Sequence, residues 1–231
     1  MFHGKMKAVT FSYDDGVKQD RRLVEMLNRY GLKATFNLNS ALLGKQGKVE
    51  IEGMPIRHDK ITAAEVRSVY AGHEIAVHTL NHPNLTTLPE KEIIRQVEED
   101  RKALGQLAGY EVIGMAYPCG GVNHDDRVAG IIQNKTGVRF ARTITSTYSF
   151  SHQLNRYKFH PTVHHMEWDK LFSLGQQFLD LNPGEPQLFY IWGHSYELDY
   201  GEAWEKFEGF CRFISGYRDI FYGTNREVFD L

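Results

Sequence analysis

The stretch Phe11-Ser12-Tyr13-Asp14-Asp15-Gly16 decides how this sequence is interpreted. It completes the apolar run Ala8-Val9-Thr10-Phe11, which predicts a short buried strand. Two adjacent carboxylates at the end of a buried strand repel each other, and their desolvation is costly unless a metal ion or a positively charged partner compensates. The stretch therefore predicts a site that uses negative charge at the end of the first strand.

The overall composition is typical of one α/β domain spanning residues 1–231, because 231 residues with 42% hydrophobic content suffice for a substantial core. The formal net charge of −2 gives no reason to expect nucleic acid or an anionic membrane as partner. The two cysteines, Cys119 and Cys211, lie far apart, which suits a reducing compartment rather than a disulfide framework. The oligomeric state is not readable from the sequence.

The chain carries no charged-then-apolar signal sequence before the first strand and no apolar run of about 18 residues that would span a membrane. The default expectation is a soluble cytoplasmic protein. A chain trimmed at its N-terminus would look the same, so that alternative stays open.

Predicted strands and helices alternate along the chain, which favours a parallel sheet wrapped by helices, either open or closed into a barrel. Residues 39–60 interrupt the alternation and are interpreted as a small hairpin or flap, whereas 143–165 gives little signal. After the first strand, further strands are expected at 33–38, 73–78, 112–117, 138–142 and 188–192, and helices at 17–30, 62–69, 89–107, 124–135, 167–181 and 201–217.

Unusual polar residues follow the predicted strands at the point where each strand ends. Because the carboxyl ends of parallel strands meet at one edge of a sheet, we expect these side chains to lie on one rim. They are Asp14, Asp15, His78, His82, Tyr117, Cys119, Arg142 and His194.

His78-Thr79-Leu80-Asn81-His82 has the spacing of two metal ligands on one face of a single helical turn, which Pro83 ends. Such a pair alone is more often coincidence, but Asp15 would complete the two-histidine, one-carboxylate set of an open catalytic site. His194 has two interpretations. It could be a core histidine with a satisfied ring, or a functional imidazole that the nearby Glu197 or Asp199 orients.

These motifs in series resemble the polysaccharide deacetylases of carbohydrate esterase family four, which share the NodB homology domain. The family's opening Thr-Phe-Asp-Asp-Gly is matched by Ser12-Tyr13-Asp14-Asp15-Gly16. Its His-Ser/Thr-x-x-His is matched by the segment 78–82, and its final Leu-x-x-His by Ile191-Trp192-Gly193-His194. The resemblance implies a distorted (β/α) barrel of about seven parallel strands.

The resemblance also implies a metal centre. Asp15, His78 and His82 would bind a divalent metal, most often Zn²⁺, with Co²⁺ or Ni²⁺ as alternatives. Asp14 would be the general base and His194 the general acid. The implied reaction is attack of a metal-bound water on an amide carbonyl, which releases acetate from an N-acetylated saccharide.

Other rim residues have implied roles around that centre. The backbone amide of Cys119 would meet the oxyanion, and Tyr117, Trp192 and Tyr196 are candidates for contacting the substrate. Trp168 and Tyr148 could also stack on sugar rings, although aromatic residues near a rim are as often core.

The sequence departs from the family at its third motif, Arg-x-Pro-Tyr/Phe, where Ala116 replaces the arginine and Cys119 the aromatic residue. We hypothesise that Arg142 pairs with Asp14 instead, the alternative being an arginine on the outer surface. The fourth motif is also poorly matched, and Glu167 or Trp168-Asp169 are its possible remnants without an assigned role.

Three other functions remain open at this point. The same metal site could act on another acyl amide or a cyclic amide, or the domain could be an inactive glycan-binding module. A nucleophilic Cys119 is the weakest alternative, because a lone cysteine is more often an inert small hydrophobe.

Overall fold

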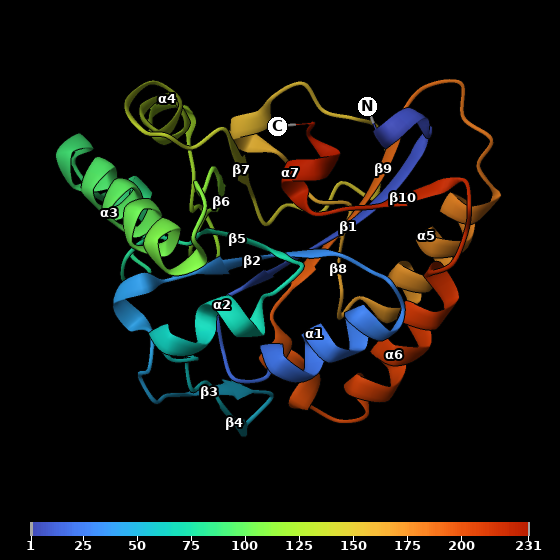
Figure 1. Ribbon diagram of the computed structural model, residues 1–231, viewed down its shortest axis with the longest axis horizontal. Helices are drawn as coiled ribbons and strands as arrows, with labels where there is room; N and C mark the ends of the chain where they lie inside the picture. The colour runs from blue at the N-terminus through green and yellow to red at the C-terminus, as the bar shows by residue number, and fades with distance from the viewer. Residues whose placement is uncertain (1, 231) are drawn as a thin grey trace.

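Parallel strands form a sheet that curls into a half-barrel, with the helices arranged around its outside (Figure 1). The computed structural model describes residues 2–230. The strand order is β7-β6-β5-β2-β1-β9-β8, and β10 pairs with the first half of β1. All pairings in this sheet are parallel, as the alternating sequence pattern predicts. The α/β fold of barrel type with about seven parallel strands is therefore confirmed.

The longer helices are amphipathic and bury their apolar faces in the core. The sheet strands are β1 (Lys7–Asp14), β2 (Ala34–Leu38), β5 (Glu74–Val77), β6 (Gly114–Ala116), β7 (Phe140–Arg142), β8 (Val163–His164), β9 (Gln187–Gly193) and β10 (Ile220–Tyr222). The helices are α1 (Asp20–Arg29), α2 (Val66–Val69), α3 (Glu90–Ala108), α4 (Asp126–Lys135), α5 (Trp168–Asp180), α6 (Ala203–Ile214) and α7 (Asn225–Val228), with the 3-10 helix η6 (Ser195–Asp199) before α6.

Strand β1 is central, and every one of its residues is buried. It pairs with β2 so that Asp14 stands opposite Asn37, and with β9 so that Tyr13 stands opposite Gly193. A Cβ atom at Gly193 would lie 2.1 Å from the His165 ring, so only glycine permits this close approach. The register brings the ends of β1 and β9, and the residues that follow them, to one rim.

The hairpin predicted within 39–60 is confirmed as β3 (Lys48–Ile51) and β4 (Met54–Arg57), which pair antiparallel. Its two turn residues, Glu52 and Gly53, have φ values of 48° and 80°, the left-handed conformation that a tight hairpin turn requires. In Figure 1 it is drawn below α2, at the end of the view opposite α7.

One local prediction is wrong. Residues 78–82 form an irregular loop rather than a helical turn, with Thr79 at φ 68° and His82 at φ 64°. Pro83 excludes the helical conformation from His82, and the loop instead closes through the Thr79 hydroxyl, which accepts from the His82 backbone amide at 3.2 Å. None of the helices in the described residues is long and apolar enough to cross a membrane.

Candidate active site

Asp14 and Arg142 form a buried ion pair between the ends of β1 and β7. Arg142 Nη2 lies 2.5 Å from both carboxylate oxygens of Asp14, and Asn37 Nδ2 donates to Asp14 Oδ1 at 2.8 Å. Burial alone raises the pKa of Asp14, but the charges of Arg142, His78 and His194 and the hydrogen bond from Arg142 together outweigh it, so that the net pKa is lowered. The arginine hypothesised from the sequence thus contacts Asp14 and keeps its carboxylate ionised.

The guanidinium of Arg142 is itself fixed on every side. Its Nε donates to Ser12 Oγ at 3.2 Å, its Nη1 donates to the Thr143 carbonyl at 3.0 Å, and its carbon lies 4.7 Å from the centre of the Trp192 ring. Asp14 therefore has little freedom to change its orientation.

Asp15, His78 and His82 bring one ligand atom each within 4.8 Å of one another. His78 Nδ1 lies 2.9 Å from the carbonyl of Ala116 and so carries the proton, which leaves the lone pair of Nε2 toward the site. His82 Nδ1 lies 3.7 Å from Cys119 Sγ, whose thiol donates to the His82 carbonyl, and His82 Nε2 faces Asp15 Oδ1 at 3.7 Å. His78 thus directs an unprotonated nitrogen into the cluster, and His82 Nε2 lies on the Asp15 side of its ring.

This donor set fits a divalent cation. Burial lowers the pKa of His78 to about 4 and also lowers that of His82, so both imidazoles are neutral near pH 7, as metal ligands must be. Two imidazole nitrogens and one carboxylate oxygen match the protein ligands of open catalytic zinc sites.

Backbone strain is concentrated at this rim. Asp15, Thr79, His82 and Cys119 all have φ between 64° and 82°, which is rare for residues other than glycine. Such strain persists only where the surroundings enforce it, and it clusters at functional sites.

Two residues that the sequence did not indicate, His58 and Lys60, also contact Asp15. His58 Nε2 lies 3.1 Å from Oδ2, and Lys60 Nζ lies 3.2 Å from Oδ1 and donates to the Asp15 carbonyl at 2.7 Å. Burial raises the pKa of Asp15, but the His58 hydrogen bond and the Lys60 charge hold it well below its usual range. Both residues follow the hairpin, where only the length of the loop hinted at a function.

His194 follows β9 and faces Glu197, since its Nδ1 lies 3.3 Å from Glu197 Oε2. Burial lowers the pKa of His194, but Glu197 more than reverses this and the pKa rises to about 9. Asp199, the alternative partner, instead accepts hydrogen bonds from Trp204 and Gln19. His194 is therefore cationic near pH 7.

Two further histidines that were not predicted, His164 and His165, contact the same carboxylate. Their Nε2 atoms lie 3.2 Å and 2.8 Å from Glu197 Oε2, which also accepts from the His194 backbone amide at 2.9 Å. Glu167, a suggested remnant of the fourth motif, accepts instead from Ser146 and Tyr148 and does not reach His194.

One pocket of about 240 Å³ is lined both by the aspartates and histidines of the candidate metal group and by His194. The expected substrate-contacting residues line it, although Tyr117 is fully buried and its hydroxyl donates to the Tyr157 carbonyl. The lining is Asp14, Asp15, His78, His82, Tyr117, Cys119, Gly120, Ile144, Trp192, His194 and Tyr196.

A family model described as polysaccharide deacetylase matches residues 3–141, which is more than half of the chain. This chain belongs to the polysaccharide deacetylase family of carbohydrate esterases. The matched residues contain Asp14, Asp15 and both histidines of the cluster, whereas Arg142 and His194 lie beyond them.

Curated relatives of this deacetylase family align with half of the chain. A peptidoglycan-N-acetylglucosamine deacetylase of Listeria monocytogenes is 28% identical over 120 residues, covering 51% of this chain and 22% of the relative. Chitin deacetylase 1 of Cryptococcus neoformans is 30% identical over 122 residues, covering 52% of this chain and 22% of the relative. The aligned part thus spans about a fifth of the length of these relatives.

The fold resembles solved deacetylase structures along the whole chain. A structure described as T48 deacetylase with substrate superposes with a TM-score of 0.60 at 16% identity, covering 100% of this chain and 94% of that chain. At that identity the likeness concerns the fold.

Proposed function

We propose that this chain is a metal-dependent hydrolase that removes N-acetyl groups from a saccharide. The observation that carries the proposal is the arrangement around one pocket: a two-histidine, one-carboxylate group lies between an ionised, arginine-paired Asp14 and a cationic His194. Pairs of titratable groups whose surroundings push their pKa values apart are what acid–base catalysis requires.

Asp15, His78 and His82 would hold the cation, and their nitrogen and oxygen atoms suit Zn²⁺, with Co²⁺ or Ni²⁺ as alternatives. A divalent cation bound there would polarise the acetamide carbonyl and make a neighbouring water more acidic. Lys60 Nζ shares Asp15 Oδ1, so the cation would compete with an ammonium group for this oxygen.

The chain's own residues would manage the protons. Asp14, kept ionised by Arg142, would accept a proton from the attacking water. His194, kept protonated through Nδ1 by Glu197, would donate from Nε2 to the departing nitrogen, so that acetate and a free amine are released. The backbone amide of Cys119, held at φ 70°, is the proposed donor to the oxyanion.

A nucleophilic role for Cys119 is less favoured. Burial raises the pKa of its thiol, with a further contribution from Asp15, and the thiol donates its proton to the His82 carbonyl. A reactive cysteine needs the opposite shift, toward the thiolate.

The family supports the substrate class, since the names of the matched relatives specify peptidoglycan and chitin. The same metal site acting on a non-polysaccharide acyl amide or a cyclic amide, and an inactive glycan-binding domain, remain the competing proposals. An acetate-release screen over N-acetylated oligosaccharides and simple amides, with added Zn²⁺, Co²⁺ or Ni²⁺, separates them.

The control for the screen is Asp14→Asn, which removes the base and leaves the three ligands in place. Acetate release from oligosaccharides that is lost in Asp14→Asn supports the proposal. Activity on simple amides alone favours the first competitor, and saccharide binding without acetate release favours the second.

A further inference from the structure

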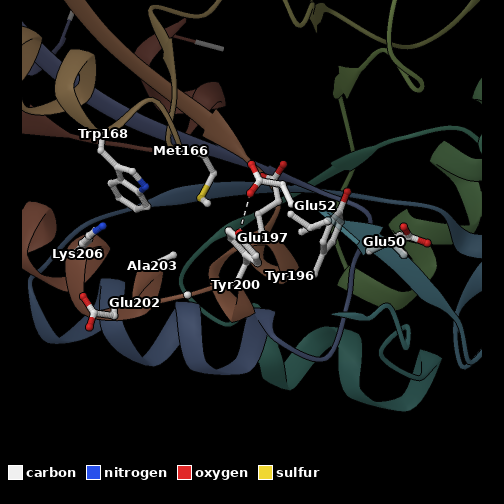
Figure 2. A pocket seen from close by; sticks show the side chains of 13 residues that line it. Glu50, Glu52, Met166, Trp168, Tyr196, Glu197, Tyr200, Glu202, Ala203 and Lys206 are labelled. Carbon is white, nitrogen blue, oxygen red and sulfur yellow. Dashed lines mark hydrogen bonds between the residues drawn. The ribbon is translucent and has the colours of Figure 1, made fainter. Parts of the chain in front are cut away.

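The two ends of the parallel sheet carry different elements. Beyond the ends of the strands lies the catalytic pocket, and a larger pocket of about 600 Å³, drawn in Figure 2, shares Tyr196 with it. Toward the beginnings of the strands lies α7, whose Arg226 backbone amide donates to Glu74 Oε2, in the first residue of β5, at 2.8 Å. The side chains inside the half-barrel lie between α7 and the catalytic residues.

Strand β1 presents a polar face to the inside of the half-barrel. Successive side chains of a strand point to opposite faces, so Thr10, Ser12 and Asp14 share one face. The other face is apolar, because Phe11 and Tyr13 pack against α6. Thr10 and Ser12 are completely buried, and a buried hydroxyl group is costly unless it finds a partner. The partners of these hydroxyls therefore define what the polar face connects.

Ser12 joins Arg142 to a second strand. Its Oγ accepts from Arg142 Nε at 3.2 Å and from Asn37 Nδ2 at 2.9 Å, and Asn37 also donates to Asp14 Oδ1 at 2.8 Å. A hydroxyl oxygen has two lone pairs, so these two donors occupy both and leave the hydroxyl proton of Ser12 for an acceptor. The Tyr190 hydroxyl is that acceptor: burial raises the pKa of Tyr190 overall, while the charge of Arg142 and a hydrogen bond with Ser12 lower it in part.

Tyr190 is bonded in turn to α7. Asn225 Nδ2 donates to the Tyr190 hydroxyl oxygen at 2.6 Å, and Asn225 Oδ1 accepts from the Thr10 hydroxyl at 3.0 Å. The backbone amide of Asn225 donates to Thr35 Oγ1 at 2.8 Å, and all four residues are buried. Because both polar atoms of the Asn225 side chain are bonded, its orientation is fixed, and with it the position of the Tyr190 hydroxyl.

Apolar contacts hold α7 against this chain of hydrogen bonds. The centre of the Phe229 ring, directly after α7, lies 4.9 Å from that of the Phe140 ring and 4.7 Å from that of the Phe159 ring. Phe159 also contacts Tyr190, with ring centres 5.7 Å apart. Phe140 begins β7, the strand that ends at Arg142. The α7 segment thus packs against both Tyr190 and the strand that carries Arg142.

We propose that α7 positions the Arg142–Asp14 pair from the far end of the strands. The link runs from Asn225 through Tyr190 and Ser12, and these three are positioning residues that do not touch the substrate. The proposal rests on the proposed function, because Asp14 is the base of that reaction. A misplacement of about 1 Å at a reacting group can cost about a hundredfold in rate, so the loss of a distant support is measurable.

The first test measures steady-state kinetics of acetate release. Ser12→Ala removes the acceptor of the Arg142 Nε proton and should lower kcat about tenfold, and Tyr190→Phe should lower it about fivefold. KM and the metal content should stay within about twofold of wild type, because neither Ser12 nor Tyr190 lines the pocket. Ser12→Thr keeps the hydroxyl and should retain most of the wild-type kcat.

Tyr222→Phe is the matched control. It deletes a tyrosine hydroxyl that donates to the Ile214 carbonyl at 2.8 Å, in β10, and should lower stability without lowering kcat. Asn225→Ala should lower kcat about threefold, but little further in the Tyr190→Phe background, where the bond it removes is already absent. Losses that add in full, or wild-type kcat in Ser12→Ala, would overturn the proposal.

A spectroscopic readout needs no turnover. The Nε–H group of Arg142 gives its own signal in an NMR spectrum of isotope-labelled protein, and Arg142→Lys identifies that signal. We expect it to shift in Tyr190→Phe and in Asn225→Ala, and to keep its position in Tyr222→Phe. If no N-acetylated saccharide is hydrolysed with any metal, the proposed function fails, and this signal still decides whether α7 is linked to Arg142. A signal that moves in neither variant overturns the link whatever the substrate.

Discussion

Residues 2–230 contain two groups of two histidines and one carboxylate, and the two groups have opposite hydrogen-bonding character. Asp15, His78 and His82 form one, and His164, His165 and Glu197 form the other; in both, the candidate ligand atoms lie within 4.8 Å of one another. Composition and spacing alone do not distinguish them. The difference lies in which nitrogen of each histidine carries the proton.

In the first group the proton of His78 points away from the cluster. His78 Nδ1 donates to the Ala116 carbonyl, so Nε2 presents a lone pair. In the second group His164 Nδ1 accepts from the Met166 backbone amide and His165 Nδ1 accepts from the Tyr13 hydroxyl, so both Nε2 atoms donate to Glu197. The first group offers lone pairs to a cation, and the second surrounds an anion with donors.

This difference indicates that tautomers, which are set by partners outside each group, decide whether such a group offers lone pairs to a cation or, as in the cage of histidines around Glu197, encloses an anion. In this cage, His164, His165 and His194 surround the one carboxylate of Glu197. Burial raises the pKa of Glu197, but the three histidines lower it more, so that this pKa lies well below the usual range. The following predictions test the contrast, from the largest expected effect to the smallest.

His78→Ala should abolish metal binding and lower acetate release by about a thousandfold, because it removes one of three ligands. His164→Ala is the matched comparison and should leave the metal content unchanged. Metal content after purification, measured by emission spectrometry, checks both. A protein that loses its metal on the His164 substitution would reverse the two assignments.

Arg142→Met should leave the Asp14 carboxylate buried and unpaired, which costs about 3–5 kcal/mol of unfolding free energy. The pKa of Asp14 should then rise, because its largest favourable charge is lost. Asp14 is the proposed base, so activity near neutral pH should fall about a hundredfold and recover partly as pH rises. Urea unfolding and a pH–rate profile measure the two effects, and an unchanged acid limb would contradict the pairing.

Glu197→Gln should lower the pKa of His194 from about 9, because Glu197 is the main group that raises it. The protonated acid is the active form, so the alkaline limb of kcat/KM should move to lower pH while metal content stays constant. The wild-type limb should lie near pH 9. A limb that does not move would exclude His194 as the titrating acid.

Lys60→Met should tighten metal binding several-fold, since it removes a cation that shares Asp15 Oδ1. Competition with a coloured chelator measures the affinity. Lys45→Met is the control, because it removes a neighbouring exposed lysine from the same loop. Weaker binding in Lys60→Met would show that Lys60 positions Asp15 rather than competes for it.

Residues at strand ends could be predicted from the sequence, because the topology of a parallel sheet fixes where they gather. Asp14, Asp15 and His194 are of this kind. Arg142 could be proposed only because Ala116 stands where the family has its arginine. Arg142 and Asp14 are separated by 128 positions in the sequence, so no local pattern predicts their contact. The irregular backbone at 78–82 was not predictable, since the pattern that places two histidines together also fits a helical turn.

The residues that were missed lie in segments without periodicity. His58 and Lys60 follow a hairpin whose position depends on side-chain contacts, including the Tyr200–Glu52 hydrogen bond. His164 and His165 follow a weak stretch, and their role depends on Glu197, which lies in a different loop. Such long-range contacts have no local signature.

The hairpin leaves and rejoins the fold at almost the same point. The Gly44 amide donates to the Ile61 carbonyl at 2.7 Å, and the Lys60 amide donates to the Lys45 carbonyl at 2.8 Å. The segment between these bonds is therefore a module whose length and sequence can be exchanged without altering the strands that carry Asp14 and His194. Selection acting on residues 46–57 alone could therefore change what this module contacts, while His58, Lys60 and the strands that carry the site are inherited unchanged.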